Sequence, residues 1–312
     1  MIVLEMCLEK SLVHRIPHRV TIAILITFTL YGIGCAQSPT SPTSERFPNE
    51  LYELDKEMVI GEYGVCLWRS VNSEKRRYQG IVTISCNGKL LARHEWALGF
   101  GDLTGTDIIG NGNPNVIITL YSGGAHCCFE TMIYDLGLIL TEVPVSSSPQ
   151  GNCHGTFQDL DGDGIYEIVT CDDAFAYRYC AYAYSPAVRV ILKYEAEVGY
   201  VPASPKFAYL YADDIDEHTQ WAKRATRGDP INGWYNTSKC AVLPLVLDYL
   251  YSGRIEEAWQ ALYRYYTFPD IEEFRTDIQR VVHRSPYFVQ TKVQAGEGRE
   301  LAGHRETGNW RQ

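Results

Sequence analysis

The sequence predicts an α+β protein, in which an N-terminal antiparallel β domain is followed by a small helical domain. Between residues 63 and 201, short runs of β-branched and aromatic residues alternate with glycine, asparagine, aspartate and proline. A pattern of turn residues followed by an apolar run recurs within this region at an offset of 52 residues. After about residue 205 the apolar residues take up helical spacing instead.

The first 36 residues have the composition of an export signal. Basic side chains at Lys10, Arg15 and Arg19 precede a 14-residue apolar run from Val20 to Ile33, and small residues follow it. Such a run is short for a membrane-spanning helix and has the length of the apolar part of a signal peptide. We therefore expect these residues, 1–36, to direct the chain out of the cytoplasm.

Two alternatives are open at the end of this signal. "GIGCAQ", residues 32–37, resembles the lipobox of bacterial lipoproteins, although Gly32 stands where that motif usually has leucine. The resemblance implies a lipid on Cys35 and a partner membrane; the alternative is ordinary cleavage after Ala36. Both place the protein outside the cytoplasm, either in the cell envelope or secreted. Residues 37–50, rich in Ser, Pro and Thr, are then expected to form a tether.

The β domain is expected over residues 51–205. Its strands are predicted at 80–86, 115–122, 131–137, 166–171 and 187–195. The stretch "AFAYRYCAYAY", residues 174–184, alternates small and aromatic residues and predicts one more strand. Its tyrosine face suits packing better than it suits a platform for a ligand.

The helical domain is expected over residues 206–290. Acidic residues in the first turns and glycine after the last turns mark helix ends. Helices are predicted at 213–228, 238–253, 255–266 and 269–283. Pro244 predicts a kink in the second of them, and the polar residues 291–312 are expected to be a disordered tail.

The sequence "DLDGDGIYE", residues 159–167, predicts a calcium site. Its aspartates stand at every second position, so their carboxylates can converge as the chain curls around Gly164. Calcium prefers six to eight oxygen ligands and tolerates flexible loops. The expected ligands of this structural calcium are the side chains of Asp159, Asp161, Asp163 and Glu167 and the carbonyl oxygen of Ile165.

A strand, rather than a helix, follows this loop, which excludes an EF-hand. The loop resembles those of FG-GAP and VCBS repeats, the blades of integrin-α-type propellers, and the resemblance covers residues 100–195. It implies calcium binding and blade-like units. Because residues 47–205 hold three such units and a closed propeller needs at least four, we expect an incomplete propeller or a sandwich. The earlier copy, residues 107–117, has neutral Asn111 and Asn115 and predicts a turn with weak or no calcium binding.

The stretch "YSGGAHCCFE", residues 121–130, resembles the SGGAHCC signature of certain exported bacterial proteins, a resemblance that implies no activity. Three interpretations are open. Cys127 and Cys128 could form two disulfides, with partners such as Cys153 and Cys171. They could instead join His126 and His154 in a copper or zinc site, or one could be a reactive thiol with His126 as its base.

Disulfides are the general expectation for the cysteines of an exported chain. Beyond Cys35, eight remain: Cys66, Cys86, Cys127, Cys128, Cys153, Cys171, Cys180 and Cys240. Their connectivity does not follow from the sequence. Only one pair is local, since Cys66 and Cys86 lie on two runs that could form a hairpin.

The chain carries a net charge of −10, which argues against a nucleic-acid partner. The sequence thus predicts an exported, lipid-anchored envelope protein with a structural calcium ion. It would act as a binding or structural module for an unknown protein or glycan ligand. The alternatives are an envelope hydrolase using His126 or His154 with nearby acids, and a metal- or redox-handling protein using Cys127 and Cys128. Enzymatic activity is left open, with a non-catalytic role favoured.

Overall fold

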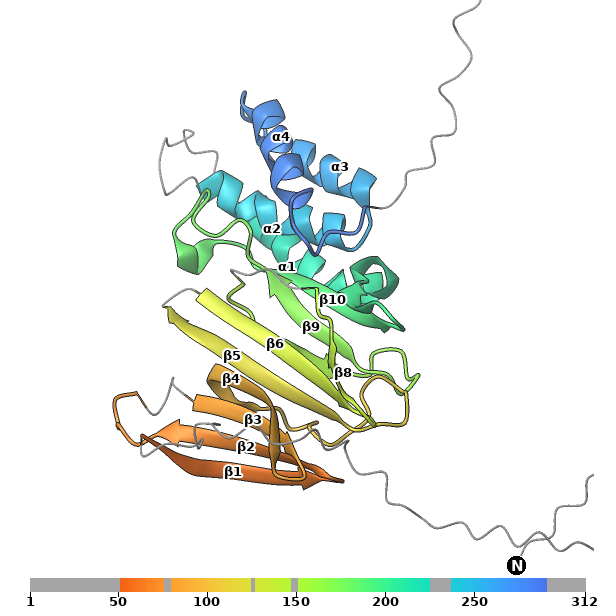
Figure 1. Cartoon of the computed structure of the whole chain (residues 1–312). Helices are drawn as coiled ribbons and strands as arrows, with labels where there is room; N and C mark the ends of the chain where they lie inside the picture. Colours follow the sequence, from red (N-terminus) through yellow and green to blue (C-terminus); the bar gives the residue numbers. More distant parts are fainter. Residues whose placement is uncertain (1–50, 76–79, 125–126, 147–150, 225–236, 291–312) are drawn as a thin grey trace, which may run out of the picture.

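The computed structural model describes residues 51–75, 80–124, 127–146, 151–224 and 237–290. Within these ranges the protein is α+β, with two antiparallel sheets and four α-helices, as predicted (Figure 1). The expected export signal, the tether, Cys35 and the polar tail lie outside these ranges. No helix in the described part of the chain is long and apolar enough to cross a membrane.

The first sheet has seven strands that follow one another in chain order. They are β1 (Tyr52–Ile60), β2 (Tyr63–Ser70), β3 (Gly80–Cys86), β4 (Lys89–Phe100), β5 (Asn115–Gly124), β6 (Cys127–Leu136) and β7 (Leu140–Val143). Most of the long strand β4 pairs with β3, and its last residues, from Ala97 to Phe100, pair with β5. β4 therefore connects the first three strands of the sheet, β1–β3, to the last three, β5–β7.

The second sheet has four strands, also in chain order. They are β8 (Thr156–Gln158), β9 (Glu167–Asp172), β10 (Val188–Glu195) and β11 (Gly199–Pro202). Backbone hydrogen bonds tie this sheet to the segment that follows β7, because Tyr200 N donates to Pro144 O at 2.8 Å and Ser146 N donates to Tyr200 O at 2.9 Å. The two sheets form no closed propeller within the described residues.

A 3₁₀ segment, η2 (Ser204–Tyr211), leads into the helices. These are α1 (Ala212–Arg224), α2 (Thr237–Tyr251), α3 (Ile255–Tyr265) and α4 (Ile271–Val282). One face of α4 is buried, and its residues follow helical spacing, with Phe274, Ile278 and Val282 almost fully enclosed. Pro244 lies within α2.

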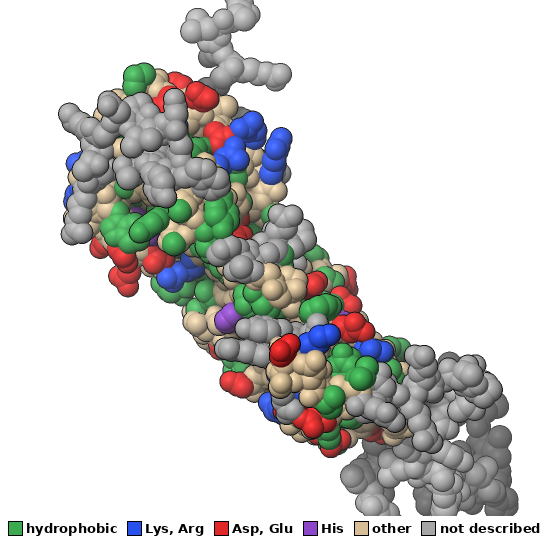
Figure 2. Space-filling model, turned by 90° about the vertical axis from the view of Figure 1, so that its left-hand side faces the viewer, with side chains coloured by type: hydrophobic (Ala, Val, Ile, Leu, Met, Phe, Trp, Pro, Cys, Tyr) green, Lys and Arg blue, Asp and Glu red, His purple; other side chains and the backbone are tan. Residues whose placement is uncertain are grey.

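Two hydrophobic cores separate the protein into layers. Successive residues of a strand point to opposite faces, so Val116 and Ile118 on β5 face a core shared with β2, β3 and β4. Ile117, between them, faces a second core that continues through the four-stranded sheet and the helices. The order of the layers is thus β1–β4, β5–β7, β8–β11 and helices, stacked along the long axis of the molecule (Figure 1, Figure 2).

The prediction of a strand at residues 174–184 is wrong. This segment, between β9 and β10, consists of turns and a short 3₁₀ helix, η1 (Tyr182–Tyr184). Tyr177 has φ +59°, which no extended strand allows. A disulfide from Cys180 to Cys240 in α2, with a Cα–Cα distance of 6.0 Å, holds the segment against the helices instead of in a sheet.

The predicted hairpin containing Cys66 and Cys86 is present, but the disulfide between them is not. Cys66 has a free thiol, and the register of β2 and β3 places it opposite Thr83, while Cys86 lies opposite Tyr63. The two cysteines therefore point to opposite faces of the sheet. Cys86 is disulfide-bonded and almost fully buried, whereas the Cys66 sulfur lies 3.9 Å from a carboxylate oxygen of Glu57.

Candidate functional site

The predicted calcium loop connects β8 to β9, and its first aspartate shapes the backbone. The Asp159 carboxylate accepts hydrogen bonds from Gly162 N at 2.8 Å and Gly164 N at 3.2 Å. Both glycines have positive φ, +76° and +83°, which residues with a Cβ rarely adopt. Ile165 N then donates to Asp163 Oδ1 at 2.8 Å, so the loop curls around its own carboxylates.

Three of the four acidic side chains of this loop converge on one point, and the predicted ligand Asp163 is not among them. Carboxylate oxygens of Asp159, Asp161 and Glu167 all lie within 4.8 Å of one another. Calcium binds oxygen at about 2.4 Å, so oxygens with this spacing can share one ion. Glu167 is fully buried, and its Oε2 accepts a hydrogen bond from Leu160 N at 2.9 Å, which fixes its position. The side chains present therefore fit a hard divalent cation.

The ammonium group of Lys193 lies among these carboxylates. Its Nζ is 2.7 Å from Asp161, 2.9 Å from Asp163 and 2.9 Å from Glu167. Lys193 is on β10, one residue beyond Leu192, which pairs with Ile168 on β9, and so it stands beside Glu167. Its side chain is only 18% exposed. A positive charge thus occupies the centre of the loop.

The contacts within the cluster favour the charged forms of Lys193 and Asp163. Burial opposes a charged Lys193, but hydrogen bonds to Asp161, Glu167 and Asp163 outweigh it and raise the Lys193 pKa above its ordinary value. The same contact with Lys193 lowers the pKa of Asp163. Four carboxylates face one ammonium, so three negative charges remain unbalanced. That excess favours a further cation.

The earlier copy of the loop has the same backbone but different charges. Asp107 accepts hydrogen bonds from Gly110 N at 2.8 Å and Gly112 N at 2.7 Å, as Asp159 does in the second copy. Asn115 stands at the position of Glu167, and its Oδ1 accepts from Ile108 N at 2.8 Å. Asparagines and glycines thus hold this turn.

The strand partners of the two loops carry opposite charges. In the earlier copy Asp135, paired with Asn115 across β5 and β6, accepts from the amides of Asn111 at 3.0 Å and Asn113 at 3.2 Å. In the second copy the corresponding neighbour is Lys193, which donates to carboxylates. Each loop is therefore closed by a side chain from the adjacent strand.

The two loops contact each other and connect the layers. Tyr166 N donates a hydrogen bond to Ile108 O at 2.9 Å, and the side chain of Ile165 packs over Gly110. On its other side the second loop reaches η2, because Tyr209 Oη donates to Leu160 O at 3.0 Å. The loop from Asp159 to Glu167 therefore contacts the middle layer, its own sheet and the start of the helical layer.

Gly110→Ala is expected to destabilise the protein through this contact. A Cβ at residue 110 would lie 2.9 Å from Cγ1 of Ile165, and the φ of +72° is unfavourable for alanine. Strain and overpacking together should lower the free energy of unfolding by about 2–4 kcal/mol, measured by urea denaturation. Gly112→Ala is the matched control, since Gly112 has φ +88° but open space around it. Equal losses in the two variants would contradict a specific contact between the loops.

The cysteines near the GGAHCC stretch are bonded, but not in the predicted arrangement. His126 and the Cys127 side chain lie outside the described residues, while Cys128 is disulfide-bonded. Cys153 is bonded to Cys171, with a Cα–Cα distance of 5.5 Å, so neither can pair with Cys127 or Cys128 as predicted. These bonded sulfurs give a soft metal site or a reactive thiol no support.

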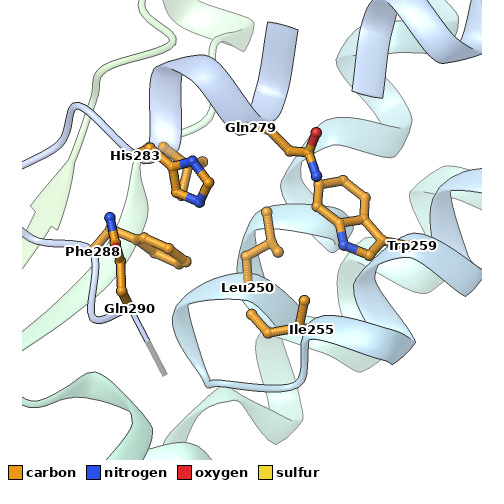
Figure 3. A pocket seen from close by; sticks show the side chains of 8 residues that line it. Leu250, Ile255, Trp259, Gln279, His283, Phe288 and Gln290 are labelled. Carbon is orange, nitrogen blue, oxygen red and sulfur yellow. The ribbon is translucent and has the colours of Figure 1, made fainter. Parts of the chain in front are cut away.

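A separate pocket lies in the helical layer (Figure 3). Aliphatic and aromatic side chains from α2, α3 and α4 form most of its wall, with polar groups at its edge. Its lining consists of Leu250, Ile255, Trp259, Gln279, Val282, His283, Phe288 and Gln290. None of the site residues predicted from the sequence lines it.

Comparisons with known proteins show distant similarity only. The chain is 26% identical over 159 residues to a probable thylakoid lumen protein of Synechocystis, covering 50% of this chain and 45% of that protein. It is 25% identical over 165 residues to an uncharacterized protein of Sinorhizobium fredii, covering 50% of this chain and 26% of that protein. The chain thus spans less than half the length of these relatives. No family model and no solved structure matches it.

Lys193 is the site residue that sequence reasoning missed. It belongs to a strand, 187–195, that the sequence did predict, but the calcium loop was interpreted from its own residues alone. The available signal was a lysine directly after the apolar run from Val190 to Leu192, in the strand that follows the acidic loop. A buried strand rarely carries an unpaired lysine, so a nearby acidic partner could have been sought.

Proposed function

We propose that this chain is an exported envelope protein whose β domain is held in shape by a structural calcium ion and serves as a binding or structural module. Export is supported by the signal-like first 36 residues, by disulfides such as Cys153–Cys171, and by the similarity to a probable lumenal protein. The lipobox-like sequence supports a lipid anchor on Cys35 and hence a membrane partner.

The observation that carries the calcium proposal is the convergence of Asp159, Asp161 and Glu167 around a point that already attracts the Lys193 ammonium. The ion would be held by these three carboxylates together with Asp163 and the carbonyl of Ile165. It would supply charge neutralisation and no reaction chemistry. Because the loop contacts three layers, neutralising it stabilises the relative positions of both sheets and η2.

The module's ligand is proposed to be a protein or a glycan of the envelope. A domain braced by disulfides and by a cation loop keeps a fixed surface outside the cell, where the solvent cannot reduce its disulfides. The acidic charge of the chain disfavours nucleic acid as the ligand.

Calcium is expected to raise the melting temperature of the mature protein. At a free calcium concentration about a hundredfold above Kd, binding stabilises the folded state by about 2.7 kcal/mol. For a protein of this size we expect a rise of about 5 °C or more, and its loss on adding EGTA. The measurement is thermal unfolding followed by circular dichroism, with metal content determined by mass spectrometry.

Asp161→Asn should abolish most of this calcium-dependent rise, because it removes one of the converging carboxylates. Asp216→Asn, which alters an exposed acid on α1, is the matched control and should keep the full rise. A melting temperature that calcium and EGTA leave unchanged in the wild type would refute the structural ion.

A further inference from the structure

We propose that the β9–β10 connection and the adjoining end of the β5–β6 hairpin form a platform of tyrosine rings that binds a glycan strand. This inference deepens the proposed function, since it names the ligand class and the surface of that module. We call this surface the tyrosine platform, and it consists of Tyr121, Phe129, Asn152, His154, Asp173, Tyr177, Tyr182 and Tyr184.

The platform brings together aromatic rings from three separate segments. Tyr177 and Tyr182, in the β9–β10 connection, have ring centroids 5.3 Å apart. On the hairpin Tyr121 and Phe129 stack with centroids 4.6 Å apart, and His154 lies edge-on to Phe129 at 5.6 Å. The hairpin end and the connection lie on the same side of the molecule, which is the side that Figure 2 faces (Figure 1).

Hydrogen bonds through the segment at residues 151–154 join the two groups of rings. Phe129 N donates to Gly151 O at 2.9 Å, which attaches this segment to the hairpin. On the other side Asn152 N donates to Asp173 Oδ2 at 3.1 Å, and the Asn152 side-chain amide donates to the Tyr182 hydroxyl. Hydrogen bonds thus connect the segments that carry the rings.

Disulfides hold the platform from both sides. Cys153–Cys171 fixes the segment at 151–154 to the end of β9, and Cys180–Cys240 fixes the middle of the β9–β10 connection to α2. Between them Ser185 Oγ accepts a hydrogen bond from Tyr177 N at 3.0 Å. A surface whose geometry is fixed before binding loses little conformational entropy when a ligand arrives.

Tyr177 holds an unfavourable backbone conformation at the solvent surface. Its φ is +59°, a region that bulky residues rarely occupy, and its side chain is 42% exposed. Glycine would fit this backbone without strain, so the tyrosine stands here at a backbone cost. Strain of this kind concentrates at binding and catalytic sites, where the side chain is required for another purpose. Tyr184, nearby in the same connection, is 73% exposed.

The chemistry of the platform matches that of a sugar. A sugar ring offers one apolar C–H face, which packs on an aromatic ring, and a rim of hydroxyl groups, which need hydrogen-bond partners. The platform supplies both, since tyrosine is an amphipathic ring and Asp173, Asn152 and His154 lie among the rings. The core of a protein–protein interface is instead depleted of charged side chains. The charge of −10 and Asp173 disfavour polyanionic ligands.

The test is co-sedimentation of the mature, calcium-loaded protein with three insoluble polysaccharides: chitin, cellulose and purified peptidoglycan. We expect the wild type to sediment with at least one of them. Tyr184→Ala should weaken that binding about fivefold, the loss typical of one aromatic contact. Tyr263→Ala, which removes a 40% exposed ring on α3, outside the platform, is the control and should bind as the wild type does.

Tyr177→Gly separates a role in binding from a role in folding. It relieves the left-handed strain, so the melting temperature should stay equal or rise, while polysaccharide binding falls about fivefold. Wild-type protein that sediments with none of the three polysaccharides would overturn the glycan assignment. Unchanged binding in both tyrosine variants would overturn the location. The calcium-dependent melting shift, measured on the same samples, reports separately on the proposed structural ion.

Discussion

Glu167→Ala is expected to lower the free energy of unfolding by about 3 kcal/mol or more, because it removes a fully buried carboxylate that pairs with the largely enclosed Lys193 ammonium. Glu167 accepts hydrogen bonds from Leu160 N and from Lys193 Nζ, both at 2.9 Å. Alanine leaves the partly buried Leu160 amide without this acceptor and removes the least exposed partner of the ammonium. Urea denaturation followed by tryptophan fluorescence measures the loss.

Two further variants show whether this loss belongs to the loop. Glu167→Gln keeps an acceptor for Leu160 N but removes the charge, so it should fall between the wild type and Glu167→Ala. Glu195→Ala, at the exposed end of β10, the strand that carries Lys193, removes only a solvent-exposed contact with Lys206 at 3.7 Å. It should change stability by less than about 1 kcal/mol. If the losses from Glu167→Ala and Glu195→Ala are equal, the buried pair does not hold the loop.

Removing the Cys180–Cys240 disulfide is expected to have the other large effect. The bond closes a sequence separation of 60 residues, and the chain-entropy model gives about 4 kcal/mol for a loop of that length. The double variant Cys180→Ala with Cys240→Ala also releases the β9–β10 connection from α2. Thermal and urea unfolding under oxidising conditions should show a correspondingly lower stability.

The free thiol provides the control for this prediction. Cys66→Ala removes a half-buried cysteine that forms no disulfide, so its stability should stay within about 1 kcal/mol of the wild type. If the double variant proves no less stable than Cys66→Ala, the Cys180–Cys240 bond does not brace the fold.

Local patterns predicted the regular elements well where turn residues and apolar spacing agreed. The strand predicted at 80–86 is β3, and the helix predicted at 269–283 contains α4, which buries one apolar face. The strand predicted at 166–171, after the acidic loop, is β9, which begins one residue later, at Glu167. In these cases the burial that stabilises each element follows from its own sequence period.

Long-range contacts account for what the sequence could not predict. Residues 174–184 alternate like a strand, yet the Cys180–Cys240 bond and the left-handed Tyr177 take them out of the sheet. The strand β1 was missed because, at the edge of its sheet, most of its residues are exposed and carry no clear apolar period. Its pairing depends on β2, and cysteine pairing likewise depends on which strands become neighbours.

In the candidate site, too, the local pattern was predicted and the long-range contact was not. The oxygens of Asp159, Asp161 and Glu167 converge as the spacing of the loop predicts, because a tight turn with two left-handed glycines brings alternate side chains together. Lys193 comes from the next strand and reaches the loop only when β9 and β10 pair. The sequence of residues 159–167 alone therefore cannot predict the contact with Lys193.

The most direct test of a cation-centred loop is a calcium titration of the wild type and Lys193→Met by isothermal calorimetry at the same pH and ionic strength. If the ammonium and calcium compete for the same carboxylates, removing the ammonium should tighten calcium binding about tenfold or more, which corresponds to about 1.4 kcal/mol. The circular dichroism spectrum of Lys193→Met in calcium should match that of the wild type. Equal calcium affinities in the two proteins, or no calcium binding by either, would contradict a shared cation position in this loop.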